Sequence, residues 1–130
     1  MRRALLIFAV AALAGCRDDG ATMTLPGGLE VERAGTLLEE QPGGETWMIL
    51  QVLAPGLAGQ RITAADMAED TVLLCTEWGL PAAQEQVTSP DQIVVQIMSE
   101  MVERGTPAPD VTQVFAGYRL QDGACIWEDF

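Results

Sequence analysis

Three acidic side chains, Asp66, Glu69 and Asp70, are three and four residues apart in a segment with helical character. On a helix this spacing places the side chains on one face, where carboxylates can share a cation. The alternative is a solvated face, because acids near a helix start are favoured by the helix dipole. No calcium-loop pattern of alternating acids occurs in the sequence. We therefore expect a solvated face, with no metal site and no cofactor.

The residue types that are missing exclude most catalytic chemistry. The chain contains neither histidine nor lysine, so Ser89 and Ser99, its only serines, have no imidazole or amine as a base. Without lysine no Schiff base can form. Carboxylate chemistry remains, because two of the 19 Asp and Glu residues could form a glycosidase acid and base pair. We expect a non-enzymatic protein, and a carboxylate-dependent hydrolase of envelope glycans is the alternative.

The N-terminus has the layout of a secretory signal: Met1-Arg2-Arg3, an apolar run from Ala4 to Ala14, and then small residues. The apolar run rises only about 17 Å as a helix, against roughly 30 Å of hydrocarbon, so it is too short for a spanning anchor. Leu13-Ala14-Gly15-Cys16 resembles the bacterial lipobox, which implies a diacylglycerol on the Cys16 thiol and a mature chain that begins there. The alternative is cleavage after Ala14, because Ala12-Leu13-Ala14 also fits a cleavage site.

Lipidation at Cys16 predicts where the protein is located in the cell. Two or more acyl chains hold a protein firmly at a membrane, and the polar residues after Cys16 suit a short tether. We assign residues 1–15 to a signal peptide, 16–24 to the lipidated cysteine and tether, and 25–130 to a folded domain. The expected location is the periplasmic face of a bacterial membrane, or the soluble periplasm if cleavage follows Ala14. Arg17 gives no argument for retention at the inner membrane.

The cysteine count agrees with export. The chain has three cysteines, and if Cys16 carries lipid, then Cys75 and Cys125 remain as an even pair in an oxidising compartment. We expect a disulfide between them, with two buried free thiols as the alternative. Cleavage after Ala14 would leave the same pair and a reactive thiol at Cys16.

The net charge and the aromatic residues at the C-terminus indicate which partners the protein can bind. The formal net charge of −12 repels phosphate backbones, so we expect no nucleic-acid partner. The chain ends in Trp127-Glu128-Asp129-Phe130, and an envelope protein could dock on Trp127 and Phe130, because interfaces favour aromatic anchors. Alternatively, Trp127 belongs to the core and Phe130 ends an edge strand. A further alternative is a small-ligand carrier with Trp47, Trp78 and methionines around a pocket.

The first half of the domain predicts a hairpin and a helix. Residues 35–40 and 45–53 flank the turn sequence Gln41-Pro42-Gly43-Gly44. Thr63 and Asp66 have capping-box spacing for a following helix, and Gly79 with Pro81 is expected to end it. One face of that helix is apolar or small and should dock on the sheet: Met67, Thr71, Leu74, Cys75 and Trp78.

The second half predicts a strand and a hairpin. Ile93–Met98 is rich in β-branched residues and favours a strand, although a helical face also fits. Asp122-Gly123 between the apolar runs 114–120 and 124–127 is a strong hairpin signal. The order hairpin, helix, strand, hairpin predicts an α+β domain with one antiparallel sheet of about five strands and one main helix packed on one face.

Several of these motifs together are similar to a family of small exported bacterial proteins of unknown function. The resemblance rests on residues 44–47, residues 65–70, Cys75 and the ending 122–130, and it would cover about Leu29 to Phe130. It implies a secreted protein and brings no known activity. The lipobox does not follow from membership. We therefore expect an exported, membrane-anchored lipoprotein with a protein-binding or structural role in the envelope.

Overall fold

The computed structural model describes residues 20–128 as an α+β fold. Six strands form one sheet, and each is bounded as follows: β1 Thr22–Thr24, β2 Glu30–Glu40, β3 Thr46–Leu53, β4 Gln92–Met98, β5 Gln113–Gln121 and β6 Ala124–Glu128. The two predicted hairpins are confirmed as β2–β3 and β5–β6, and the predicted strand at Ile93–Met98 is confirmed as β4. β1 pairs with β2 and contains residues of the stretch assigned to the tether.

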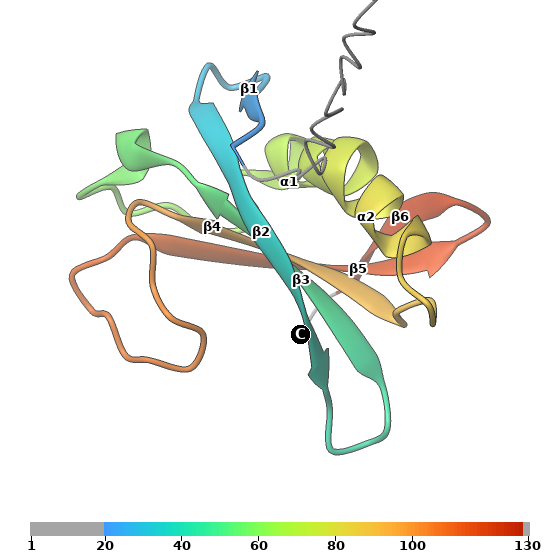
Figure 1. The fold of residues 1–130 in the computed structure, drawn as a ribbon. Helices are drawn as coiled ribbons and strands as arrows, with labels where there is room; N and C mark the ends of the chain where they lie inside the picture. Colours follow the sequence, from blue (N-terminus) through green and yellow to red (C-terminus); the bar gives the residue numbers. More distant parts are fainter. Residues whose placement is uncertain (1–19, 129–130) are drawn as a thin grey trace, which may run out of the picture.

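The strands follow one another across the sheet in sequence order, from β1 at one edge to β6 at the other (Figure 1). Every neighbouring pair is antiparallel except β3 and β4, which are parallel. The prediction of an antiparallel sheet with about five strands is therefore wrong in both respects. The cause is the helical segment between β3 and β4, because a crossover of this kind returns the chain to the end of the sheet where β3 began.

One continuous helical run crosses one face of the sheet. It consists of α1 (Ala68–Leu74), a π-helical turn η2 (Cys75–Gly79) and α2 (Leu80–Gln84), and a short 3₁₀ turn η1 (Pro55–Leu57) precedes it. The hydrogen bonds of the predicted capping box are present, since Asp66 Oδ2 accepts from the Thr63 amide at 2.9 Å and from the Thr63 hydroxyl at 2.8 Å. They lie in the turn before α1.

The prediction that Gly79 and Pro81 end the helix is wrong. Proline clashes with the carbonyl four residues earlier in an α-helix, but here the amide of Leu80 donates to the carbonyl of Cys75, which is the wider π spacing. The wider turn accommodates the ring. Gly79 serves close packing instead, because a Cβ at this position would lie 3.2 Å from the Cδ1 atom of Ile93 on β4.

The core lies between this helical run and the sheet. All five residues of the predicted helix face are at most 7 % exposed, and they pack against the alternate residues of β3, β4 and β5 that point to the same side: Met48, Leu50, Val52, Ile93, Val95, Ile97, Val114, Ala116 and Tyr118. Arg33 on β2 is also buried there, with its guanidinium carbon 5.6 Å from the centre of the Trp78 ring. The predicted docking face is thus confirmed.

A buried hydrogen bond joins the helix to the sheet. The hydroxyl oxygens of Thr71 on α1 and Tyr118 on β5 are 2.6 Å apart, and Tyr118 is 1 % exposed. Burial raises the pKa of the Tyr118 phenol above its usual value of 10.0, and the bond to Thr71 offsets part of that rise. The phenol therefore stays neutral in the folded protein at physiological pH.

We expect the free energy of unfolding to fall above about pH 10, because the unfolded chain releases the phenol proton there while the folded chain keeps it. Tyr118 is the only tyrosine and lysine is absent, so few other groups titrate in this range. Urea unfolding measured from pH 8 to pH 12 should show the loss, and Tyr118→Phe should flatten it while lowering stability at neutral pH by about 1 kcal/mol. A variant with an unchanged pH profile would contradict this assignment.

A loop covers the second face of the sheet. Residues 99–112 connect β4 to β5, and the loop is closed at its base by a bond of 2.9 Å from the Ser99 amide to the Thr112 carbonyl (Figure 1). Arg104 in this loop forms an ion pair of 2.9 Å with Glu39 and lies over the ring of Phe115, which points away from the helices. The guanidinium lowers the pKa of the Glu39 carboxyl. Ile49 and Met98, which point to that face, are fully buried.

Within residues 20–128, no helix is long and apolar enough to cross a membrane. The predicted lipidation site Cys16 and the signal peptide lie outside the described residues.

Candidate functional site

The C-terminal hairpin consists of β5 and β6, and β6 forms one edge of the sheet. Its turn is formed by Asp122 and Gly123, which both have positive φ values, 51° and 75°, as a tight hairpin requires. A disulfide between Cys75 in η2 and Cys125 in β6 confirms the predicted pair, with the two Cα atoms 6.3 Å apart. The edge strand β6 is therefore fixed covalently to the helical run.

The two edges of the sheet differ. β1 has three residues, and a very short edge strand offers little to a neighbouring chain. β6 has five residues and contains neither proline nor a basic residue, which are common protections of an edge. Two apolar side chains of β6 are substantially exposed, Ile126 at 46 % and Trp127 at 39 %. β6 is thus the edge that suits an added strand.

The predicted C-terminal tail is described only in part. Trp127 pairs with Tyr118 across the hairpin, and the two rings meet edge to face with their centres 5.6 Å apart. Trp127 therefore borders the core on one side and remains partly exposed on the other. Phe130 lies outside the described residues, so its predicted role is carried forward only as a prediction.

Polar side chains from three strands meet beside β6. The carboxylate of Glu128 accepts a hydrogen bond of 2.6 Å from the Gln92 amide nitrogen and forms an ion pair with Arg119. Gln92 begins β4 and is 9 % exposed. Its amide oxygen is buried without a hydrogen-bond partner in the part of the chain that the structure describes. Such an orphaned acceptor is uncommon, because burial removes its bond to water.

A depression of about 360 Å³ lies over this cluster, and Gln92 and Arg119 are among its lining residues. Glu45 and Asp91 line it as well, and Leu120 contributes an apolar wall. Asp91 is held in place by the amide of Thr46, which donates to its Oδ2 at 2.8 Å. We call this depression the Gln92 pocket.

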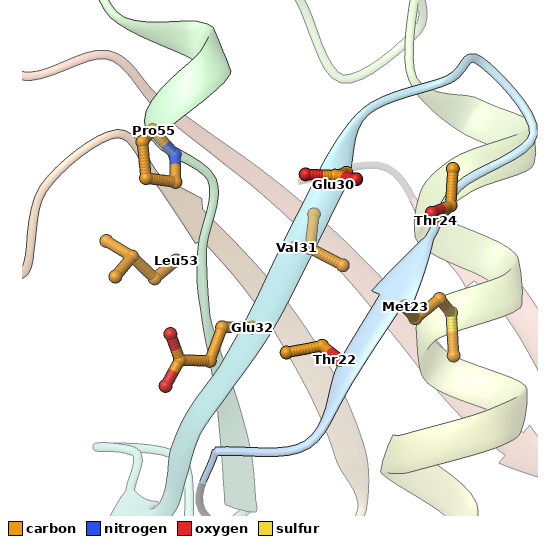
Figure 2. Close-up of a pocket in the computed structure, with 8 residues that line it drawn as sticks. All are labelled: Thr22, Met23, Thr24, Glu30, Val31, Glu32, Leu53 and Pro55. Carbon is orange, nitrogen blue, oxygen red and sulfur yellow. The ribbon is translucent and has the colours of Figure 1, made fainter.

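A second hollow of about 530 Å³ lies at the opposite edge of the sheet, over β1, β2 and the end of β3 (Figure 2). Glu32 and Leu53 are register partners and lie side by side in it, with Pro55 above them. The lining also includes Glu30 and Thr22, and among the described residues none of these acids forms an ion pair. Its polar side chains point in different directions and do not converge on one point (Figure 2), so it gives no indication of a bound molecule.

The three acids of the predicted face, Asp66, Glu69 and Asp70, line one open depression of about 320 Å³ beside Gly27. Asp66 is engaged by Thr63, which lowers the pKa of its carboxyl, and Asp70 accepts a hydrogen bond of 3.2 Å from the Gly27 amide. Over residues 20–128 no three Cys, Asp or Glu side chains lie close enough to hold a metal ion. The acids cap turns and face solvent.

The two tryptophans named for a small-ligand carrier lie in different surroundings. Trp78 is in the core, while Trp47 is half-buried on β3 and donates from its ring nitrogen to Glu45 at 3.2 Å, so the two do not share a pocket. Within the described part of the chain, the pKa values of the Glu39 and Asp66 carboxyls are lowered by their hydrogen bonds, whereas a glycosidase acid needs a raised pKa.

The sequence comparison identifies the family. A model described as a family of unknown function, DUF6497, matches residues 7–130. The chain belongs to this family. No curated protein and no solved structure matches the chain. Membership in DUF6497 confirms the predicted resemblance to a family without a known activity.

Sequence reasoning identified Trp127 and Cys125 in this part of the DUF6497 chain but missed the polar cluster beside them. Gln92, Arg119 and Glu128 come from three different strands, and only the β4–β5–β6 register places Gln92 opposite Arg119. The sequence signal that could have indicated this cluster is the polar residue Gln92 at the start of the apolar strand β4.

Proposed function

We propose that this DUF6497 protein is an exported lipoprotein of the bacterial envelope that binds another protein by adding a segment of it to the edge of strand β6. The signal and the lipobox at Cys16 support export and anchoring, and the disulfide suits an oxidising compartment. In the alternative, cleavage after Ala14 leaves the same binding domain free in the periplasm.

The observation that carries this proposal is the exposure of Ile126 and Trp127 on a terminal strand that a disulfide holds rigid. Strand addition gains main-chain hydrogen bonds from the edge, and it gains selectivity from the side chains that alternate along it. A fixed edge loses little entropy when a partner docks, which favours binding.

Charge defines the partner further. The chain has a formal net charge of −12, so a partner segment with basic residues is favoured over a second copy of the same acidic chain. The partner we propose is therefore an extended, basic segment of an envelope protein.

The docking edge is tested with a photo-reactive phenylalanine analogue in cells. Placed at Ala124 on β6, it should form a discrete adduct with one protein, whereas the same analogue at Met101, which is 53 % exposed in the loop after β4, should not. Ile126→Glu should abolish the adduct from position 124. Equal labelling from both positions, or an adduct that persists with Ile126→Glu, would refute docking at β6.

The anchor is tested separately by fractionation. Cys16→Ala should move the protein from the membrane fraction to the soluble periplasmic fraction, because the acyl chains supply the attachment. A wild-type protein that is already soluble would reject lipidation and favour cleavage after Ala14.

A further inference from the structure

The Gln92 pocket has the features of a site for one cationic side chain. Its carboxylates Glu45 and Asp91 form no ion pair with another residue within 20–128. Arg119 also lines the pocket, but its charge is balanced by Glu128. The local charge is therefore negative, and a cation is the favoured occupant.

The orphaned oxygen of Gln92 specifies the occupant more closely. Gln92 is nine-tenths buried, and its nitrogen is committed to Glu128, so its oxygen lacks only a donor. Leaving an acceptor of this kind unpaired costs about 1–3 kcal/mol, which an entering donor recovers. The oxygen is covered in the structure, so a donor must approach it from the pocket that Gln92 lines.

A metal ion does not fit these requirements. Over residues 20–128 there is no group of three ligating side chains that could hold one. A guanidinium does fit, because it has five N–H donors and no acceptor, and its fork can reach oxygens on separate elements. Leu120 supplies an apolar wall for its methylene groups.

The position of the pocket connects it with the docking edge. Arg119 and Leu120, which line it, are the register partners of Ile126 and Cys125 on β6. β6 therefore lies between an added segment and these two residues, so only a long side chain that crosses β6 can reach the pocket. The Gln92 pocket has a volume of about 360 Å³, near the lower end of the range of about 300–1,000 Å³ for ligand pockets. This volume suits one long side chain.

We propose that the Gln92 pocket binds an arginine side chain of the partner segment, with Glu45, Asp91 and the Gln92 amide oxygen as acceptors. This inference rests on the proposed docking at β6. It assigns the pocket the role of selecting a segment with an arginine at one position, while the strand edge supplies affinity that does not depend on sequence.

The test uses nuclear magnetic resonance titrations of the chain from residue 16, with Cys16→Ala to keep it in solution. The probe is Nα-acetyl-arginine methylamide, and the matched control is the citrulline analogue, which has the same shape without the charge. We expect saturable shifts of the Gln92 side-chain amide and of the Arg119 backbone amide, with binding about tenfold weaker for citrulline.

Variants make the assignment specific. Glu45→Gln removes an exposed charge and should weaken arginine binding by several-fold, and Gln92→Leu should weaken it by about tenfold. Glu100→Gln, which removes an exposed charge outside the pocket, should leave binding unchanged. Equal binding of citrulline, or shifts confined to other residues, would overturn the arginine site. The photo-adduct at β6 would then still stand, whereas loss of the adduct with a working arginine site would reject the docking edge alone.

Discussion

Replacing Cys75 and Cys125 together by alanine lowers the free energy of unfolding by about 4 kcal/mol. The bond closes a loop with a sequence separation of 50 residues, and the chain-entropy model gives a cost of this size for removing such a closure. Cys75 is fully buried, so the double substitution also avoids leaving one unpaired thiol in the core. Urea unfolding monitored by tryptophan fluorescence measures the difference.

Reduction of the wild-type protein provides the control for the cysteine variant. A reductant breaks the same closure without removing a sulfur atom, so both samples should unfold at nearly the same urea concentration. A double variant as stable as the oxidised protein would show that the bond contributes nothing to the folded domain. In that case the disulfide would not fix β6 to the helical run.

Leu74→Ala lowers the free energy of unfolding by about 2–5 kcal/mol, because Leu74 is fully buried between α1 and the sheet. Truncation leaves a cavity that the rigid sheet cannot fill. Thermal or urea unfolding of the variant measures the loss, and its circular dichroism at low temperature should remain native.

Val72→Ala on the same helix is the matched control for Leu74→Ala. Val72 is 37 % exposed, and alanine has the higher helix propensity, so its stability should change by less than about 0.5 kcal/mol. A similar loss in both variants would mean that the helix is stabilised by its own turns. Its stability would not then depend on packing against the sheet.

The sequence predicted the elements whose signals are local. Asp122-Gly123 specifies its own turn, and the spacing from Met67 to Trp78 identifies the buried helix face. The cysteine pair followed from the count and the expected compartment, and the structure joins the two residues.

The failed predictions concern arrangements that depend on distant residues. The parallel pairing of β3 with β4 was missed, although an apolar strand followed by a helix and a second apolar strand favours a crossover. Gly79 and Pro81 do not end the helix, because a π turn that no local sequence pattern specifies accommodates the proline, and Gly79 lies against Ile93. β1 is too short and too polar to give a periodic signal.

The candidate site was the least predictable part of the fold. Trp127 stood out by its type, but the Gln92 pocket requires a register across three strands that no local pattern specifies. The orphaned oxygen of Gln92 is likewise a property of burial, which a sequence of this kind does not reveal.

The parallel contact between β3 and β4 divides the sheet into two antiparallel meanders, β1–β2–β3 and β4–β5–β6. Among residues 20–128 the disulfide ties the helical crossover to the second meander only, and the first is held by non-covalent contacts. Partial opening at this seam would bare two apolar strand edges of eight and seven residues. Aggregation of the destabilised protein should therefore proceed through β3 and β4, because the disulfide does not hold the first meander in place.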